Sequence, residues 1–205
     1  MTAIWRQARR TCHPVVVIGL AACSALVLPG CGGGPTDDDE SGDRNAALID
    51  AAWSNDVTAA RELIGAGADV NHKDGTQQSA YLISTSEGYL ELLELTLENG
   101  ADVASLDSFN GTGLIRASER GHADVVERLL QTEIDVNHVN NLGWTALHEA
   151  ILLGDGSERY VRTVRLLLEH GADPDLRTGR DGRRPIELAE DMNQASVIEL
   201  LQAGR

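Results

Sequence analysis

Few residues in this sequence are of types that could do chemistry: six histidines and a short polar run with Asp155, Glu158 and Tyr160. Those three could supply the acid and the base of a hydrolase. His72 and His138 are 66 residues apart, twice the 33-residue period described below, which places them about 20 Å from each other. That separation is too long for one shared metal ion. The chain has no HExxH, GxSxG, GxGxxG or phosphate-loop pattern, so we expect no catalysis, no cofactor and no metal site.

Composition narrows both the fold class and the class of partner. The chain has 205 residues, and its 32 acidic against 17 basic side chains give a formal net charge of −15. This acidity argues against binding to nucleic acids and anionic membrane surfaces, because both need clustered cations. Aromatic residues make up only 3% of the chain, which favours an aliphatic, helical core over a β-sandwich. All three cysteines lie within the first 31 residues, so the remainder has no disulfide framework.

Residues 1–30 have the three-part pattern of an export signal. Three arginines precede an apolar stretch at residues 15–28, and no acidic residue occurs before Asp37. The stretch is too short to span a membrane, which needs about 20 residues, but it suits the apolar part of a signal peptide. It ends in Leu-Pro-Gly-Cys31, which resembles the lipobox of bacterial lipoproteins. In that family the cysteine is lipidated and becomes the mature N-terminus.

Two cysteines could carry the lipid, and both alternatives stay open. We favour Cys31, because Gly32-Gly33-Gly34 follows it as a flexible tether. Leu-Ala-Ala-Cys23 fits the residue types but would leave an apolar run on the mature protein. Residues 31–43, which include an acidic run, are expected to form a flexible linker. The expected location is the cell envelope, periplasm-facing and lipid-anchored, with the outer membrane favoured because residue 32 is not the aspartate that retains enteric lipoproteins at the inner membrane.

A 33-residue period runs through the rest of the chain. Three sets of landmarks share this spacing: Asp69, Asp102 and Asp135; Leu48, Tyr81, Leu114 and Leu147; and Asn55, Gly88, Gly121 and Gly154. A fourth copy of the phrase around the aspartates, His-Gly-Ala-Asp173, arrives five residues late. We attribute the delay to an insertion within residues 155–162.

This pattern resembles the ankyrin repeat family, whose unit is a β-turn finger and two antiparallel helices over 33 residues. Thr145-Ala-Leu-His148 is the nearest match to the family's Thr-Pro-Leu-His phrase, and degraded copies begin at Ser79, Thr112 and Arg184. The resemblance covers residues 44–205. It implies an all-α ankyrin-repeat solenoid of about five helix-turn-helix repeats with β-turn fingers. The expected repeats lie near 44–74, 75–107, 108–140, 141–178 and 179–205, with the first and last acting as caps.

Particular residues mark the expected helix ends. Ser79, Thr112 and Thr145 are placed to cap the N-terminus of the first helix of a repeat. The glycines at 88, 121 and 154 would end that helix in the left-handed conformation. The first helix of the chain's repeat domain is expected to begin near Asn45, and Gln194 is expected on a polar exterior of the last repeat. The resemblance implies that His148 braces neighbouring turns by hydrogen bonds.

Proteins of the ankyrin family bind partners through the turn fingers and the exposed ends of the first helices, which line a concave face. Transferred residue by residue, the resemblance implies contacts by Trp53, Glu87, Glu119, Arg120 and Leu152 on helices, and by Thr76, Gln78, Ser108, Phe109, Asn141, Leu142 and Trp144 on fingers. Aromatic side chains are frequent anchors of interfaces, which favours Phe109 and Trp144 as contacts. The alternative is that these two pack finger against finger.

The expected function is a non-catalytic protein–protein interaction scaffold, a monomeric solenoid held near a membrane. Residues 31–150 hold 6 basic and 22 acidic groups, and residues 151–205 hold 8 and 10. A protein partner with a basic patch would therefore associate along the first three repeats, at a rate raised by electrostatic attraction. Two alternatives stay open. Residues 138–145 resemble bacterial ankyrin proteins of the export pathway, which suggests an accessory factor for a periplasmic redox or peroxide-detoxifying enzyme; the other alternative is a hydrolase that uses the insertion.

Overall fold

The computed structural model describes residues 37–179 and 181–203. Within these ranges the chain forms ten helices and no β-strand, apart from one isolated antiparallel bridge between Leu106 and Thr112. The first helices of the repeats are α1 (Asp37–Trp53), α3 (Ala80–Glu87), α5 (Gly113–Arg120), α7 (Ala146–Leu152) and α9 (Pro185–Asp191). The second helices are α2 (Val57–Gly65), α4 (Leu90–Glu98), α6 (Ala123–Leu129), α8 (Glu158–Glu169) and α10 (Ala195–Ala203). The predicted all-α repeat architecture is confirmed.

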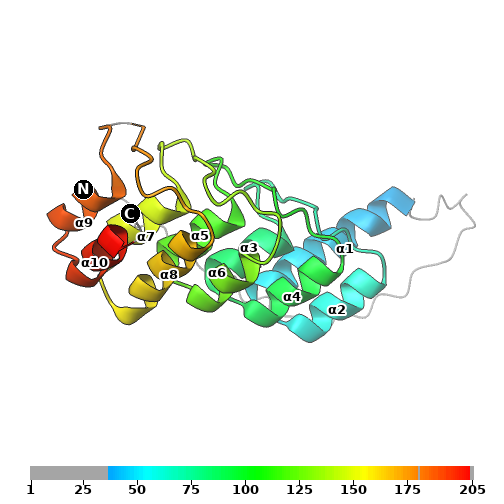
Figure 1. Cartoon of the computed structure of the whole chain (residues 1–205). Coiled ribbons are helices and arrows are strands. Elements are labelled where there is room, and N and C mark those ends of the chain that lie inside the picture. Colours follow the sequence, from blue (N-terminus) through cyan, green and yellow to red (C-terminus); the bar gives the residue numbers. More distant parts are fainter. Residues whose placement is uncertain (1–36, 180, 204–205) are drawn as a thin grey trace, which may run out of the picture. The chain divides into compact units, whose positions relative to one another are not determined.

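The helices stack in two rows, one of first helices and one of second helices, and the fingers extend to one side (Figure 1). Each helix packs on its partner within the repeat and on the equivalent helix of the next repeat. For example, α5 contacts α3, α6 and α7. This neighbour-only packing follows from the repeat itself, because a single helix pair cannot bury its own apolar face and must cover it with the adjacent pair.

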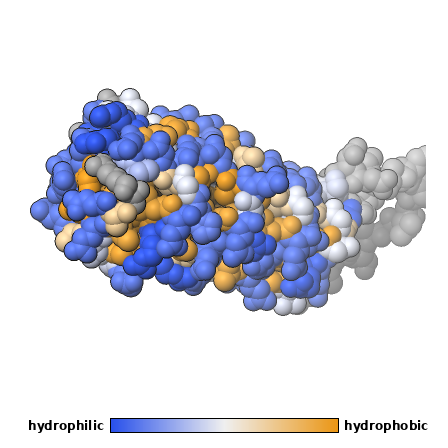
Figure 2. All heavy atoms as spheres, in the orientation of Figure 1, coloured by the Kyte–Doolittle hydropathy of each residue, from blue (hydrophilic) through white to orange (hydrophobic). Residues whose placement is uncertain are grey.

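The core is aliphatic, as the low aromatic content predicts. One buried cluster, which includes Leu48 and Ile83, joins the first two repeats, and a second, which includes Leu114 and Val126, extends from α3 to α10. Helix α3 contributes to both clusters, since Ile83 faces the first and Tyr81 the second. The second helices carry mostly hydrophilic side chains on their outer surface, with apolar residues showing between them (Figure 2).

The predicted helix caps are confirmed at most positions. The hydroxyl oxygens of Ser79, Thr112 and Thr145 each accept a hydrogen bond from the backbone N–H three residues later. Such bonds satisfy donors that the first turn of a helix leaves unpaired. Gly88 and Gly121 end α3 and α5 with φ angles of 79° and 68°, in the left-handed region that the absence of a Cβ makes accessible.

Gly154 does not have the predicted role. Helix α7 ends at Leu152, Leu153 is the C-cap with φ −104°, and the left-handed glycine of this loop is Gly156 with φ 73°. The inserted residues move the turn along the chain. Residue 154 is instead glycine because of close packing: a Cβ there would lie 2.2 Å from the carbonyl oxygen of Ala150 and 3.0 Å from the ring of Tyr160.

Two further expectations about the terminal repeats are wrong. Helix α1 begins at Asp37 and not near Asn45, so residues 37–43 of the expected linker are helical. Acidic residues in a first turn favour helix formation there, because they interact with the positive end of the helix dipole. Gln194 is buried and not part of a polar exterior: its amide nitrogen donates to the carbonyl oxygens of Ile151 and Gly154, at 2.9 and 3.0 Å. It thereby satisfies carbonyl groups at the end of α7.

Candidate interaction surface

Each finger is built around one side-chain oxygen. In the third repeat, Asp107 Oδ1 accepts hydrogen bonds from the backbone N–H groups of Phe109 and Gly111, both at 2.8 Å. Asp74 and Asn140, one period to either side, hold their fingers with the same two bonds. The sequence analysis missed these three residues, although their 33-residue spacing is a signal that would have identified them. The finger shape therefore depends on a short side chain with an acceptor oxygen at this position.

Adjacent fingers are joined through their backbones. The N–H of Asn141 donates to the carbonyl oxygen of Phe109 at 3.0 Å, and the N–H of Gly179 donates to that of Gly143 at 2.9 Å. His138 Nε2 lies 2.8 Å from the carbonyl oxygen of Asn110. These bonds hold the fingers of the third, fourth and fifth repeats in fixed positions relative to one another.

Two asparagines, each three residues before a finger residue (Asp74 or Asn140), also join neighbouring repeats. Asn137 donates to the carbonyl oxygen of Gly171 at 3.0 Å and accepts from the N–H of Asp173 at 2.8 Å. Asn71 makes the equivalent pair of bonds with Gly100 and Asp102. Each asparagine thus satisfies one acceptor and one donor of the following repeat, which fixes the spacing between repeats.

The fingers present several predicted contact residues to solvent. Ser108, Asn141 and Thr76 are exposed, and 42% of Phe109 is exposed. Gln78, Leu142 and Trp144 are half-buried. The hydrogen bonds between fingers at Phe109 and Gly143 join main-chain atoms and do not involve the aromatic side chains. Partner binding by the side chains of Phe109 and Trp144 therefore stays a prediction, as does the alternative that they pack finger against finger.

The predicted contact residues on the helices fall into two groups. Glu87 of α3 and Arg120 of α5 form an ion pair across the repeats at 2.6 Å, and Glu119 pairs with Arg116 within α5 at the same distance. Leu152 packs partly against the core, and Trp53, at the end of α1, is 46% exposed. We call the fingers together with the exposed sides of α3, α5 and α7 the finger face.

In the third and fourth repeats, the residue nine positions after the finger residue interacts with the side chain of that residue, and the sequence analysis missed both. In the third repeat, Arg116 Nε lies 3.5 Å from Asp107 Oδ2. In the fourth repeat, Asn140 Nδ2 donates to Glu149 Oε1 at 2.9 Å. The two pairs occupy equivalent places one period apart, but in the fourth repeat the carboxylate is on the helix.

Glu149 is the most unusual titratable residue of this surface. Only 4% of it is exposed, and its Oε2 atom is buried with no hydrogen-bond partner among the described residues. Burial, followed by the neighbouring Glu119 carboxylate, raises the pKa of Glu149 to about 7, against the opposing effects of Asn140 and Arg116. A carboxyl group in this setting changes its protonation state near neutral pH.

His148 braces the turns as the family resemblance implies. The N–H of Thr145 donates to His148 Nδ1 at 3.1 Å, and His148 Nε2 lies 3.0 Å from the carbonyl oxygen of Leu176, which precedes the next finger. Because Nδ1 accepts, Nε2 is the protonated nitrogen and donates to that carbonyl. Burial lowers the pKa of His148, which keeps the ring neutral.

The residues of the insertion take part in local packing and turn formation. Asp155 Oδ1 accepts from the N–H of Ser157 at 3.0 Å, and the hydroxyl of Tyr160 donates to the carbonyl oxygen of Glu119 at 3.2 Å. In residues 37–179 and 181–203, no group of three or more His, Cys, Asp or Glu side chains is arranged to hold a metal ion. None of the described helices has the length and apolar character needed to cross a bilayer.

The predicted export signal at residues 1–30 and the candidate lipidation sites Cys31 and Cys23 lie outside the described residues.

Known proteins share the pattern of this chain. The family model for ankyrin repeats (3 copies) matches residues 80–178. The ankyrin repeat protein YahD of Escherichia coli (strain K12) is 41% identical over 159 residues, which are 77% of this chain and 79% of YahD. The crystal structure of an ankyrin repeat domain from Acinetobacter baumannii is 46% identical, covers 77% of this chain and 80% of its own, and superposes with a TM-score of 0.74. The chain belongs to the ankyrin repeat family.

Proposed function

We propose that this protein is an exported, non-catalytic scaffold that binds a protein partner through the finger face and is anchored by a lipid on Cys31. The observation that carries the binding role is the construction of the finger face. Backbone bonds between fingers and the Glu87–Arg120 ion pair hold it across repeats, while Phe109 and several polar side chains remain exposed. A surface that is already ordered loses little entropy on binding. The anchor rests on the sequence pattern before Cys31.

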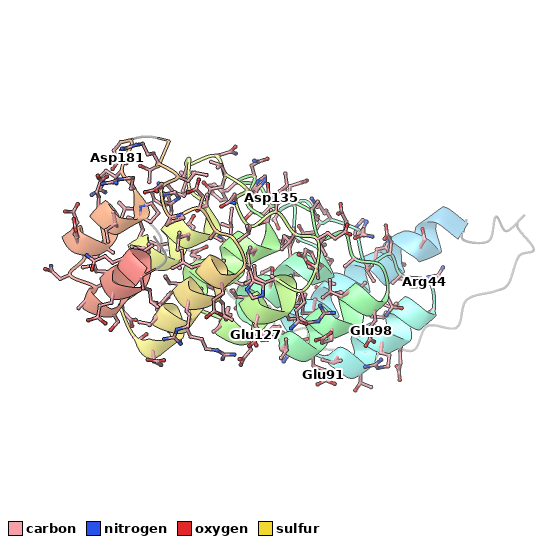
Figure 3. All side chains as sticks on the ribbon, in the orientation of Figure 1. Arg44, Glu91, Glu98, Glu127, Asp135 and Asp181 are labelled. Carbon is pink, nitrogen blue, oxygen red and sulfur yellow. The ribbon has the colours of Figure 1, made fainter. Side chains whose placement is uncertain are left out.

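The charge distribution supports a partner with a basic patch. Acidic residues predominate along the first three repeats, and Glu91 and Glu98 project from α4 (Figure 3). Several arginines of the C-terminal repeats are paired with acids: Arg162 with Asp124 and Glu127, and Arg184 with Glu187. These acids are neutralised by their arginines, so the negative field comes from the excess of acidic residues, 22 against 6 basic in residues 31–150. Binding should become markedly slower as salt increases, because exposed charges are screened beyond about 8 Å at physiological ionic strength.

The test is a crosslinking capture from envelope extract with the anchored full chain as bait and mass spectrometry as readout. We expect one stoichiometric partner, and we expect Trp144→Ala and Phe109→Ala to reduce its capture while leaving the helical content unchanged. Met192→Ala is the matched control, because Met192 is an exposed apolar residue of the last repeat, outside the finger face. A captured redox or peroxide-detoxifying enzyme would define the scaffold's process. Capture no better than that of a scrambled-repeat control would refute the scaffold role.

The anchor is tested separately by metabolic labelling with a radioactive fatty acid. Cys31→Ala should abolish the label and Cys23→Ala should retain it, since only the first removes the proposed acceptor. Labelling that depends on Cys23 alone would move the anchor to the alternative site. An unlabelled wild-type chain would contradict lipidation altogether.

A further inference from the structure

The charges between α5 and α7 on the finger face do not balance. The carboxylates of Asp107 and Glu119 lie near enough to Glu149 to act on it electrostatically, and the one arginine that acts on it is Arg116. Arg116 is already shared, because it pairs with Glu119 at 2.6 Å and approaches Asp107 at 3.5 Å. No ion pair involves Glu149 in the described part of the chain, so this carboxylate is left without a cation.

Comparison of the third and fourth repeats shows why Glu149 is left unsatisfied. In the third repeat the helix supplies a cation, Arg116, to the finger carboxylate. In the fourth repeat the finger supplies Asn140, whose amide nitrogen satisfies only the Oε1 atom of Glu149. The Oε2 atom has no donor, although it is buried. A buried, ionised carboxylate without a cation is costly, and this cost is relieved when a cation binds.

We propose that a cationic side chain of the partner, the ammonium of a lysine or the guanidinium of an arginine, docks against Glu149 and Glu119 between α5 and α7. This inference rests on the proposed scaffold function and names the group that selects the partner. Glu119, with 22% of its side chain exposed, lies nearer the surface than Glu149. Lysine and arginine have aliphatic stems that can pass along apolar surface and carry the charge inward.

Binding of the cation is coupled to the release of a proton from the carboxyl group of Glu149. The groups that act on Glu149 are Glu119 and Arg116 from α5, Asp107 and Asn140 from the fingers. Helix α9, which also packs on α7, carries Glu187, whose carboxylate bonds to Arg184 at the N-cap of that helix. A cation favours the ionised form of Glu149, so affinity should increase as pH rises through the range in which this carboxyl loses its proton.

The test measures binding of a blocked peptide of four Gly-Lys units to the full chain, by calorimetry at pH 6 and at pH 8. Wild-type affinity should be about tenfold higher at pH 8, because the ionised fraction of a group with a pKa of about 7 rises about tenfold between these values. Glu149→Gln should lose this pH dependence and bind about tenfold more weakly at pH 8. The same peptide with acetylated lysines should not bind.

Glu98→Gln is the matched control, since it removes the same charge from an exposed residue of α4 that projects away from the protein (Figure 3). It should change affinity by less than about twofold, because exposed charges are strongly screened. Equal losses for the two variants would show attraction by the general negative field and would overturn the inference, as would equal binding of the acetylated peptide.

The two proposals can fail separately. If the captured partner still depends on Phe109 and Trp144 but binds Glu149→Gln as tightly as wild type, the scaffold stands and the cation site is refuted. If the lysine peptide binds through Glu149 while no protein is captured from the envelope, the cation site stands and the scaffold is refuted.

Discussion

Replacing Glu149 by glutamine changes how the stability of the folded protein depends on pH. Burial and the Glu119 carboxylate raise the pKa of Glu149 from an ordinary value of 4.5 to about 7. Between these two pH values the folded state holds a proton that the unfolded state has released. The free energy of unfolding therefore falls as pH rises through this window, and the loss is complete above about pH 7.

The size of the effect follows from the pKa shift. Each pKa unit corresponds to about 1.4 kcal/mol, so the carboxyl group should destabilise the wild-type protein by about 2 to 3 kcal/mol more at pH 8 than at pH 5. Glutamine keeps an oxygen that can accept the bond from Asn140 but cannot ionise. The stability of Glu149→Gln relative to wild type should thus increase by this amount over the same range.

Two histidines make the free energy of unfolding rise with pH, which is opposite to the effect of Glu149. Comparing Glu149→Gln with wild type removes their contribution. Burial lowers the pKa of His122 and of His148, so the stability that each neutral ring contributes is present above about pH 6.5 and is lost as pH falls below it. Both histidines are present in wild type and in the variant. Their effects therefore cancel in the difference between the two proteins.

The assay is urea unfolding of wild type, Glu149→Gln and the exposed control Glu98→Gln at four pH values from 5 to 8, monitored by helical circular dichroism. Equal m-values would show that the same surface is exposed on unfolding in all three proteins. A stability difference between Glu149→Gln and wild type that does not change with pH would refute the reasoning. It would mean that the folded protein holds Glu149 in its ordinary ionised state.

Three further changes test the construction of the repeats by urea unfolding. Gly88→Ala should cost clearly more than the roughly 1 kcal/mol expected for Gly100→Ala, because both have positive φ but only a Cβ at residue 88 would meet the His122 ring, at 2.6 Å; equal losses would contradict this. Thr112→Val should cost about 1 kcal/mol by removing the N-cap of α5, and an unchanged midpoint would exclude that role. Asn137→Ala should cost about 2 kcal/mol and speed amide exchange in the following repeat, whereas unchanged exchange would show that its two bonds contribute nothing.

Much of the fold could be predicted because the repeat is local. The hydroxyl at 79, 112 and 145 and the glycine at 88 and 121 act within one turn of their own helix, so residue type and a 33-residue spacing are enough to place them. The same locality explains why the three finger residues could have been found. The Oδ1 atoms of Asp74, Asp107 and Asn140 accept their finger bonds from residues within the four that follow.

The candidate site could be predicted only in part. The resemblance placed Glu87 and Arg120 on one face, and the structure joins them as an ion pair. It did not identify Glu149, because the burial of a glutamate and the absence of a donor for one oxygen depend on neighbours from another repeat. Nothing in the local sequence distinguishes a buried glutamate from the many exposed ones in this acidic chain.

The sequence by itself determined the repeat length, the helix caps, the aliphatic core and the membership of the ankyrin family, since all of these depend on residue types at regular spacing. Only the tertiary structure decided the roles of residues that pack against, or bond to, residues far away in the sequence. Gly154 is small because Tyr160 and the carbonyl of Ala150 approach it, and Gln194 is buried because the end of α7 needs donors. Glu149 retains a proton near neutral pH for the same reason: packing of α5 against α7 removes water and brings a second carboxylate close.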